Sequence, residues 1–394
     1  MAVPDVFSPA QLGPITLRNR IIKAATFENR TPGALVSDDL IDYHRLPAAG
    51  GVGMTTVAYC AVAPGGRTSG SGLWMRPQAI AGLRRLTEAV HAEGALVSAQ
   101  IGHAGPVADA RSNQARALAP GRFFNPIGMR WAKRATRDDI DEVIAQHADA
   151  ARYAVDAGFD AVEIHLGHNY LASSFLSPLI NRRSDEFGGS LGNRAKVARR
   201  IVQAVHRAVG GQIAVTAKLN MTDGVRGGIG LDESLTTAKW LQDDGGLDAL
   251  ELTAGSSLLN PMFLFHGHAP VKEFAGVFGP PLRWGIRMTG TKFLRHYPYT
   301  DAYLLDTARL FRAALSMPLI LLGGITSRAT MDQAMAEGFE FVAMARALLA
   351  EPDLIKRIAA DPSTPSRCIH CNQCMPTVYR STHCVVTGAP QPSR

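Results

Sequence analysis

The stretch TRDDIDEVIAQHADAARYAVDAGFDAVEIH, residues 136–165, carries the signals of a helix, a stop and a strand in that order. Its first two thirds repeat apolar residues at helical spacing, and Asp138 and Asp139 in the first turn oppose the helix dipole. Gly158 suits the left-handed conformation that commonly follows a helix. The apolar run Ala161–His165 then has the length and composition of a buried strand. The stretch therefore predicts one α-helix followed by one parallel strand.

The same alternation recurs along the chain, and further helical patterns end at Gly94, Gly245 and Gly338. Strands that are buried on both faces read as continuous apolar runs, which predicts a parallel sheet. Eight such units favour a closed (β/α)₈ TIM barrel in the α/β class, because an open dinucleotide-binding sheet needs GxGxxG after its first strand. The predicted strands are Ile21–Ala25, Gly53–Tyr59, Leu96–Ile101, Ala161–His165, Ile213–Leu219, Ala249–Leu252, Leu319–Leu322 and Phe341–Ala345. The predicted helices are Ile80–Glu93, Thr136–Asp156, Arg194–Val209, Leu231–Asp244, Thr300–Ser316 and Ser327–Glu337.

Two segments interrupt this repeat. Residues 256–300 form a long excursion between the sixth and seventh strands, and structureless segments of that length are typical of lids or binding loops. The tail 362–394 is rich in Pro, Ser and Cys and lies outside the repeat. We expect one barrel domain over residues 1–361, including the excursion, with the Cys-rich tail packed on it.

Composition narrows the class of protein. Of 394 residues, 46% are hydrophobic and 19% charged, which is ordinary for a globular protein. The net charge of +7 comes from scattered basic residues, a pattern that fits small anionic ligands better than nucleic acid. No apolar run is long enough to span a membrane, and the first residues lack the pattern of a secretory signal. We expect a cytoplasmic protein with a small-molecule substrate, and the sequence leaves open whether it forms a homo-oligomer.

Polar residues that follow the predicted strands are candidates for chemistry, because the active site of such a barrel lies at the C-terminal ends of its strands. His165, His168 and Tyr170 follow the fourth strand. Imidazoles can donate hydrogen bonds to an oxygen, and a tyrosine can donate a proton. A histidine pair can equally bind zinc or lie in the core, and the spacing by itself does not choose among these alternatives.

A second group of residues has the pattern of a phosphate site. Gly323 and Gly324 follow the seventh strand and Arg346 follows the eighth. Glycines let backbone N–H groups approach an anion, and the loops after these two strands often bind phosphate in barrels. Two ordinary turns and a surface arginine would have the same sequence. The sequence therefore leaves open whether these residues form a phosphate site or have only a structural role.

Longer runs resemble the Old Yellow Enzyme family of FMN-dependent reductases. The resemblance is densest over residues 165–194, and it extends over nearly the whole chain. The matching runs are HLGHNYL (165–171), FLSPL (175–179), NRRSDEFGGS (181–190), Asn193-Arg194, LRNRI (17–21), GVGM (51–54), Ala61-Val62, QIGHAG (100–105) and FVAMARALL (341–349).

The resemblance implies FMN at the C-terminal ends of the barrel strands, with NADPH or NADH as the reductant. It implies that His165 and His168 bind the oxygen of the acceptor and that Tyr170 donates a proton. Lys218 would stand beside the N1/O2 edge of the flavin, where a fixed cation stabilises the reduced, anionic form. The residues implied for the cofactor are Ala24, Ala25, Thr26, Tyr59, Gln100, His165 and Lys218 at the flavin, with Gly323, Gly324, Ala345 and Arg346 at the phosphate.

Three residues depart from the family pattern. Asn169 replaces the usual glycine before Tyr170, Tyr59 replaces a small residue at the end of the second strand, and Phe27 removes a potential hydrogen bond to the flavin. These changes bear on the geometry of Tyr170, the redox potential and the size of the substrate.

The tail carries four of the five cysteines, whereas Cys60 stands alone. An odd count without a secretory signal argues against a disulfide framework. The spacing suits an iron–sulfur cluster or zinc, and it resembles the cluster region of the dienoyl-CoA reductase and trimethylamine dehydrogenase branch of the family. The shorter gap before the last cysteine and the lack of further nucleotide-binding domains depart from that branch. The candidate metal ligands are Cys368, Cys371, Cys374 and Cys384.

The sequence thus predicts an FMN-dependent ene-reductase that passes hydride from NAD(P)H to an α,β-unsaturated carbonyl or nitro compound. A first alternative is a flavin-dependent dehydrogenase or demethylase of an amine or saturated ring on the same scaffold. A second alternative is a zinc-dependent barrel hydrolase that uses His103, His165 and His168.

Overall fold

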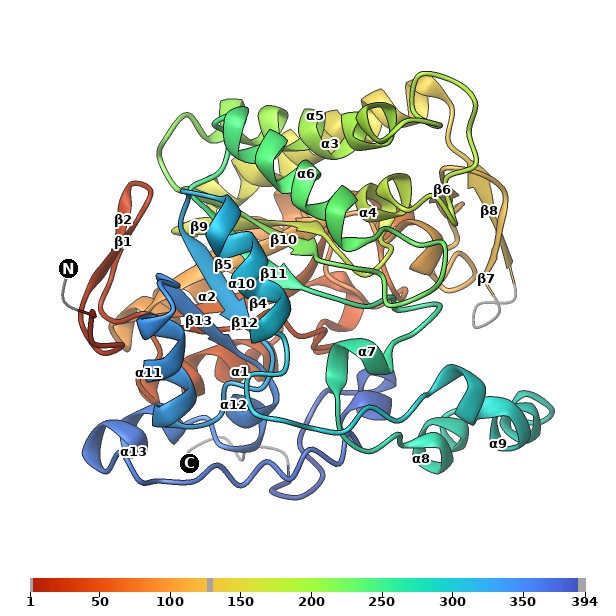
Figure 1. The fold of residues 1–394 in the computed structure, drawn as a ribbon. Helices are drawn as coiled ribbons and strands as arrows, with labels where there is room; N and C mark the ends of the chain where they lie inside the picture. The colour runs from red at the N-terminus through yellow and green to blue at the C-terminus, as the bar shows by residue number, and fades with distance from the viewer. Residues whose placement is uncertain (1–2, 126–129, 389–394) are drawn as a thin grey trace.

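The computed structural model describes residues 3–125 and 130–388, and its centre is a closed barrel of eight parallel strands (Figure 1). The predicted TIM barrel is therefore confirmed, with strand ends that differ from prediction by a residue or two. Around the barrel the strands are β3 (Ile21–Lys23), β4 (Met54–Ala61), β5 (Leu96–Gly102), β9 (Ala161–Leu166), β10 (Ala214–Asn220), β11 (Ala249–Thr253), β12 (Leu319–Leu322) and β13 (Phe341–Met344).

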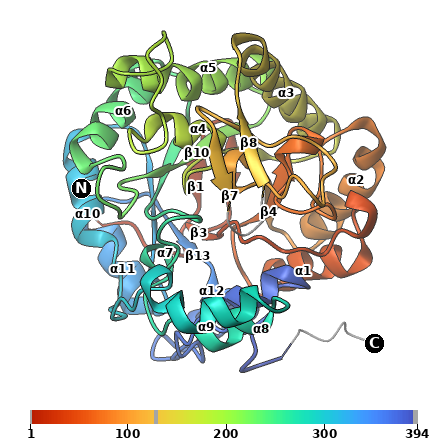
Figure 2. The ribbon, with the colours of Figure 1, turned by 90° about the vertical axis from the view of Figure 1, so that its right-hand side faces the viewer.

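Helices surround the strands, as the view along the barrel shows (Figure 2). All six predicted helices are present, although α10 is shorter than the sequence predicted. They are α2 (Pro77–Ala92), α3 (Arg137–Asp156), α5 (Leu191–Val209), α6 (Leu231–Asp243), α10 (Leu305–Ala314) and α11 (Arg328–Ala336). Further helices that the periodicity did not reveal are α1 (Asp38–Ala49), α4 (Leu171–Leu176), α12 (Arg346–Ala350) and α13 (Leu354–Ala360). In the described ranges, no helix is long and apolar enough to cross a membrane.

Helix α3 illustrates how the local sequence sets these elements. The Thr136 side chain accepts a hydrogen bond from the backbone N–H of Asp139, and the Asp139 carboxylate accepts one from the backbone N–H of Thr136. This capping box satisfies two N–H groups that the first turn leaves without helical partners. Gly158 has a φ of 81°, the left-handed conformation expected where the chain leaves α3 and enters β9.

A small hairpin closes the N-terminal end of the barrel. It consists of β1 (Ala10–Leu12) and β2 (Ile15–Leu17), which pair antiparallel. Leu12 and Leu17 are fully buried and belong to one apolar cluster with residues at the starts of several barrel strands. The opposite end of the barrel, at the C-terminal ends of the strands, therefore remains for a ligand site. Near that end lies a separate three-stranded sheet of β6 (Leu118–Ala119), β7 (Phe123–Asn125) and β8 (Arg130–Arg134).

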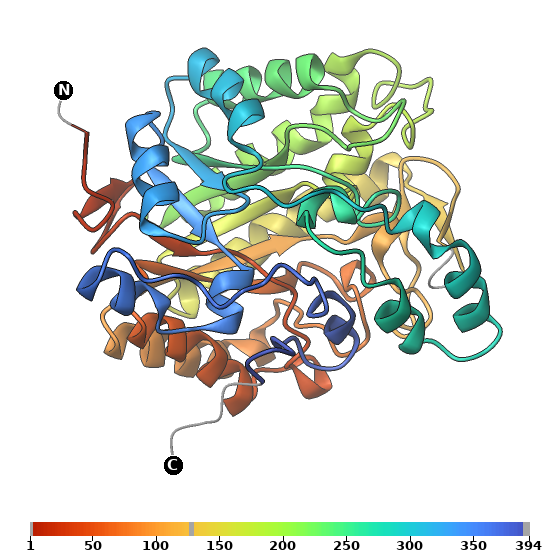
Figure 3. The same cartoon turned by 60° about the horizontal axis from the view of Figure 1, so that its bottom comes forward.

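The excursion 256–300 is not structureless, as the sequence suggested, but contains three helices. These are α7 (Met262–Phe265), α8 (Val271–Gly276) and α9 (Leu282–Phe293). Their apolar residues form a cluster of their own with Met375 of the tail, which explains why no barrel periodicity marks them. We call the excursion and the described tail, residues 362–388, the roof; Figure 3 shows its teal and dark-blue segments beside the barrel.

The tail contacts both the barrel and the excursion. The backbone N–H of Thr382 donates to the carbonyl oxygen of Glu28, and the Asn29 side chain donates to the carbonyl oxygen of Val378. The Asn372 amide donates to the carbonyl oxygens of two excursion residues, His266 and His268. Directional bonds therefore fix the described tail to the rest of the molecule, while residues 389–394 of the predicted tail lie outside the described part.

Candidate active site

A cavity of about 220 Å³ lies at the C-terminal ends of the barrel strands. We call its barrel side the floor, and roof residues such as Phe265, Met375 and Val378 line the other side. The structure thus gathers into one cavity predicted site residues from six different barrel strands and the loops after them, with Ala345 and Arg346 after β13 among them. The floor comprises Ala24, Ala25, Thr26, Tyr59, Gln100, His165, His168, Tyr170 and Lys218.

His165, His168 and Tyr170 converge on this cavity. The Nε2 atom of His165 and the Nδ1 atom of His168 lie 3.2 Å apart, and the ring of Tyr170 stands edge-on to the ring of His165 with 4.5 Å between centroids. His168 Nε2 lies 3.0 Å from the hydroxyl of Thr253 on β11. If Nε2 accepts from that hydroxyl, the ring proton of neutral His168 is on Nδ1, which faces the other histidine. In this structure the two nitrogens hydrogen-bond each other, so an acceptor oxygen that receives hydrogen bonds from both rings has to replace this contact.

Electrostatics favour the uncharged forms of all three side chains. Burial, with a contribution from Lys218, lowers the pKa of His168 to about 3. Burial, His168 and Lys218 together place the pKa of His165 well below its ordinary value. Burial also raises the pKa of Tyr170. At neutral pH the site therefore holds two neutral imidazoles and a phenol that keeps its proton, which are hydrogen-bond donors rather than ions.

Asn169, which stands where the resemblance implies a glycine, lies in a left-handed turn. His168 and Asn169 both have a φ of 58°, in the left-handed region that asparagine tolerates better than most residues. The next backbone N–H, that of Tyr170, donates to the carbonyl oxygen of Gly167, and the chain continues into α4. This turn therefore leads into α4 with Tyr170 lining the cavity.

Lys218 is held by two carboxylates that the sequence analysis did not single out. Its ammonium lies 2.9 Å from Glu163 on β9 and 2.9 Å from Glu251 on β11, and all three side chains are buried. Burial opposes the charge, but the two carboxylates outweigh it and raise the pKa of Lys218 to about 12. Gln100 donates to the same Oε1 atom of Glu163 at 2.6 Å. A charged residue inside a buried strand run was the signal that could have revealed Glu163 and Glu251.

Lys23 is a further buried cation that the sequence analysis missed. Its ammonium lies 3.3 Å from the hydroxyl of Thr26, which lines the cavity, and 3.9 Å from the Glu28 carboxylate. Burial lowers the pKa of Lys23 to about 8, although Glu28 opposes this shift. The Tyr43 ring faces the ammonium at 4.8 Å from its centroid. Positive charge therefore lies on two sides of the floor.

The predicted phosphate residues line a second, smaller cavity of about 40 Å³ beside the first. Gly323 and Gly324 have φ values of 99° and 77°, and a Cβ on Gly324 would lie 2.7 Å from the backbone nitrogen of Ala302. Arg346 donates to the carbonyl oxygen of His266 at 2.9 Å and to the side chain of Asn372. The structure thus brings together the four residues Gly323, Gly324, Ala345 and Arg346.

These observations fit a flavin mononucleotide. The Tyr59 hydroxyl and His165 Nδ1 are buried polar atoms at the cavity wall for which the described residues offer no hydrogen-bond partner. Such atoms are costly unless a ligand or water satisfies them. A cation fixed at Lys218 and a glycine-lined cavity beside Arg346 match an anionic ring system and a phosphate respectively.

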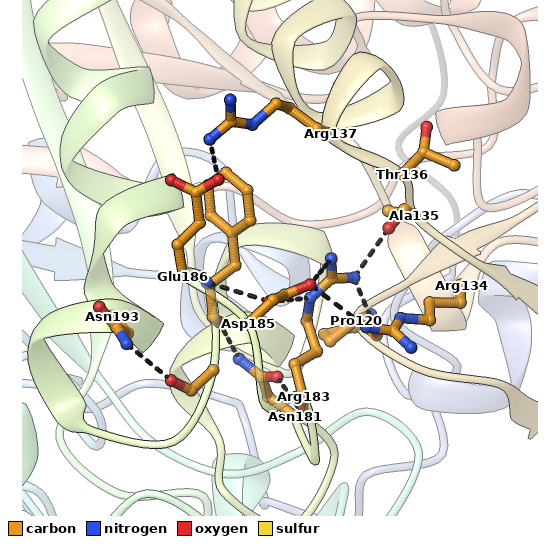
Figure 4. Close-up of polar contacts among 12 residues, drawn as sticks. Pro120, Arg134, Ala135, Thr136, Arg137, Asn181, Arg183, Asp185, Glu186 and Asn193 are labelled. Carbon is orange, nitrogen blue, oxygen red and sulfur yellow. Dashed lines mark hydrogen bonds and ion pairs between the residues drawn. The ribbon is translucent and has the colours of Figure 1, made fainter.

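The run NRRSDEFGGS, which made the resemblance specific, lines neither cavity. Arg183 donates to the carbonyl oxygens of Pro120 and Ala135, and it pairs with Asp185 (Figure 4). Asn181 donates to the carbonyl oxygens of Phe175 and Phe187. This run therefore fixes the loop after α4 against β6 and β8, and its role is to hold the frame around the floor.

The predicted metal ligands of the tail come together at a small cavity of about 20 Å³, which is lined by Cys368, Cys371, Cys374 and Cys384. All four are free thiols, and burial raises the pKa of Cys374 to about 12. Within the described ranges, however, no three His, Cys, Asp or Glu side chains are placed to hold a metal ion. In the described residues the four thiols therefore share a cavity without the geometry of a metal site, and both the ligand set and the iron–sulfur cluster stay predictions.

The zinc alternative also lacks its ligand set in the described part of the chain. His103, its third histidine, accepts from the backbone N–H of Gly105 through Nδ1. Burial and the nearby His147 lower the pKa of His103 to about 3. His103 is thus engaged in the turn after β5, while His165 and His168 face each other in the floor cavity.

The barrel and the floor define a (β/α)₈ protein with a ligand-sized cavity at its strand ends. Residues 5–253 match the sequence model of the NADH:flavin oxidoreductase / NADH oxidase family. The chain belongs to this family, that of the Old Yellow Enzymes, and is an NAD(P)H:flavin oxidoreductase, for which FMN and NAD(P)H are typical.

Three relatives indicate the range of the family around this chain. A 4,4'-dithiodibutanoate disulfide reductase of Rhodococcus erythropolis is 54% identical over 98% of this chain and 96% of its own length. A metal reductase of Desulforamulus reducens is 32% identical over 95% of this chain, which spans only 52% of that protein. An NADPH dehydrogenase of Listeria monocytogenes is 33% identical over 64% of this chain and 73% of its own length.

Solved structures show the same fold. A 2-naphthoyl-CoA reductase complex superposes with a TM-score of 0.83 at 24% identity, covering 98% of this chain and 57% of that one. An Old Yellow Enzyme homologue from Zymomonas mobilis superposes with a TM-score of 0.73 at 20% identity, covering 93% and 96%. At these identities the likeness concerns the fold alone.

Proposed function

We propose that this chain is an FMN-dependent ene-reductase that uses NAD(P)H to reduce an α,β-unsaturated carbonyl or nitro compound. The observation that carries the proposal is the convergence of His165, His168 and Tyr170, all uncharged donors, on one cavity. Reduction of such an alkene requires hydrogen bonds to the acceptor oxygen and a proton for the carbon beside the activating group.

The chain's own residues divide this work. Ala24, Ala25, Thr26, Gln100 and Lys218 would hold FMN at the floor, with Gly323, Gly324, Ala345 and Arg346 at its phosphate. Bound FMN supplies hydride transfer. His165 and His168 donate hydrogen bonds to the acceptor oxygen and draw electron density from the alkene, and Tyr170 donates its phenolic proton. Glu163 and Glu251 keep Lys218 charged and in place.

The test follows the two half-reactions separately. The purified protein is expected to show flavin absorption bands, to bleach on anaerobic titration with NADPH or NADH, and to regain its colour when 2-cyclohexenone is added. A bleached protein that 2-cyclohexenone does not reoxidise would contradict ene-reduction while leaving the family assignment intact. Adding an amine to the oxidised protein tests the dehydrogenase alternative, which requires bleaching by the amine.

Reduction of an organic disulfide is the second candidate, and it is favoured by the relative that is 54% identical over nearly the whole of both chains. Cleavage of an S–S bond takes two electrons and two protons and gives two thiols, so the protons go to sulfur and none is needed at carbon. NAD(P)H consumption and release of free thiol with 4,4'-dithiodibutanoate would support it, and the absence of both would remove it.

The tail cysteines are proposed to hold an iron–sulfur cluster, because four free thiols, those of Cys368, Cys371, Cys374 and Cys384, line one cavity. Among the described residues these thiols are not placed to hold a metal ion, so binding requires them to rearrange. Analysis of iron and acid-labile sulfide in protein purified without oxygen tests this. Protein without iron or sulfide that keeps its flavin would contradict the proposal.

A further inference from the structure

The floor cavity continues into a larger chamber of about 570 Å³ under the roof. Tyr170, Phe27 and Ser257 line both spaces, as do the roof residues Phe265, Met375 and Val378. A molecule whose reacting end lies beside Tyr170 therefore extends into this chamber. We propose that the chamber binds the body of the acceptor and selects a bulky, uncharged, aromatic or alicyclic compound. This inference rests on the proposed ene-reduction, adds the class of its substrate, and does not extend to the dicarboxylate 4,4'-dithiodibutanoate of the second candidate function.

One wall of the chamber is aromatic and belongs to the roof. Phe274, Phe278 and Phe293 come from α8, α9 and the residues between them, and Tyr379 comes from the tail. Phe274 and Phe278 contact Tyr379 edge-on, with ring centroids 6.0 and 5.3 Å apart. Edge-on aromatic contacts fix ring positions as well as burying area, so this wall presents ring faces and edges to an apolar ligand.

Short hydroxyl and amide side chains form another part of the lining. The Ser71 hydroxyl donates to the side chain of Asn29, and the Ser69 hydroxyl lies 3.2 Å from that of Ser71. The Thr68 hydroxyl is buried, and the described residues give it no hydrogen-bond partner. These side chains are neutral and can form hydrogen bonds, so the acceptor is expected to carry a neutral oxygen or nitrogen on this side.

Charge in the chamber excludes anions. Among the described residues that line it, Asp109 is the one charged side chain, and its carboxylate accepts the backbone N–H groups of Arg111 and Ser112. A carboxylate on the acceptor would lose water and meet a negative charge with no cation to pair it. The two cations of the floor cavity wall, Lys218 and Arg346, are already bonded within the protein.

The experiment uses the flavin-loaded enzyme and three enones. These are 2-cyclohexenone, which is too small to fill the chamber, 4-phenyl-3-buten-2-one, which carries an aromatic body, and the para-carboxylate of that phenyl enone. We expect kcat/KM for the phenyl enone to exceed that for its carboxylate by about 10-fold or more. The reason is that the carboxylate loses part of its hydration in the chamber without gaining a cation partner. Equal kcat/KM for the pair would overturn the inference.

Variants at Phe278 locate the effect in the chamber. Phe278→Ala removes part of the aromatic wall and Phe278→Trp narrows the space, so both should raise KM for the phenyl enone by roughly 10-fold. Turnover of 2-cyclohexenone should change less than that of the phenyl enone, because 2-cyclohexenone is too small to fill the chamber. Trp284→Ala, on the exposed face of α9, is the matched control and should change neither. Equal losses with both enones at unchanged flavin content would contradict the role of the chamber.

Asp109→Asn tests the charge. Asparagine can accept the same two N–H groups, so the turn persists while the negative charge disappears. KM for the carboxylated enone should fall by about 3- to 10-fold, as expected when one like charge is removed from a partly open site, and KM for the phenyl enone should not change. If 2-cyclohexenone itself is not reduced, the proposed function fails; if it is reduced but the carboxylate is unaffected by Asp109→Asn, only the charge argument fails.

Discussion

The floor and the roof differ in what positions their residues. The floor residues stand on barrel strands in fixed register: Lys218 lies opposite His165 across one strand pair and opposite Glu251 across the other. The roof consists of short helices and a tail whose apolar residues pack mainly on each other, and its outer face leaves Met288 83% exposed. The comparison teaches that the barrel fixes the groups that must be precise, whereas the roof can change and so can select substrates.

The largest effect, on stability and on flavin binding, is expected when the buried cation of the floor is removed from between its two carboxylates. Lys218→Met leaves Glu163 and Glu251 as neighbouring buried carboxylates without a cation. The free energy of unfolding should fall by about 3–5 kcal/mol, and flavin should be lost on purification. Urea denaturation and flavin absorbance measure the two effects. Combining Lys218→Met with Glu251→Gln removes one carboxylate and should recover part of the stability; no recovery would contradict the assigned pairing.

Tyr170→Phe tests the chemistry of the floor at unchanged shape. The acceptor half-reaction with 2-cyclohexenone should slow by about 10²- to 10⁴-fold, since a positioned proton donor is removed. Reduction of the flavin by NAD(P)H should stay nearly intact. Stopped-flow absorbance separates these steps, and Tyr153→Phe on the outer helix α3 is the control. Equal loss in both half-reactions would contradict the role of Tyr170 as proton donor.

A smaller effect is expected where the floor meets the roof, at the glycine-lined cavity. Gly324→Ala forces a Cβ to within 2.7 Å of the backbone nitrogen of Ala302 at a φ of 77°. The affinity for FMN should fall by roughly 10- to 100-fold, equivalent to about 1–3 kcal/mol of strain. Gly189→Ala is the matched control, because Gly189 has a φ of 75° and open space around it. Fluorescence titration of apoprotein with FMN gives both affinities, and a similar loss in each would attribute the effect to backbone strain alone.

The smallest effect concerns stability and lies outside both regions. Burial lowers the pKa of His147 on α3 to about 4, from an ordinary 6.5. Between these values the unfolded chain binds more protons, so the folded state loses stability as the pH falls from 6.5 towards 4, by about 2 kcal/mol at pH 5 for this group. His147→Gln should reduce the difference in unfolding free energy between pH 7 and pH 5 by that amount. An unchanged difference would mean that His147 is not a source of acid sensitivity.

Regular elements were predictable because their signals are local. Thr136 and Gly158 bound α3 as their side-chain chemistry requires, and all eight barrel strands follow from apolar runs. The helices of the excursion were not predicted, since Phe274 of α8 and Leu294, which follows α9, are buried against Met375, a residue from a distant part of the chain. A helix stabilised by such remote contacts leaves no barrel-like periodicity of its own.

The tail shows the same limit for a site. The spacing of Cys368, Cys371 and Cys374 predicted that their thiols lie near each other, and they do share one cavity with Cys384. Spacing along the chain could not say whether the thiols converge on a single point, because that depends on how each backbone segment turns against the barrel. Within the described residues they do not form a metal-binding group.

The sequence by itself determined the barrel, the strand ends that carry chemistry and the family, because periodicity, helix caps and motif spacing are properties of the linear chain. It did not reveal that Glu163 and Glu251 form ion pairs with Lys218. It also did not reveal that the Lys23 ammonium donates to the hydroxyl of Thr26, or that Thr68 and Tyr379 line one chamber. Those relations join residues from different strands and loops, so only tertiary packing decides them. Charge pairing and cavity shape depend on distances in the folded molecule, and the spacing of residues along the chain does not determine those distances.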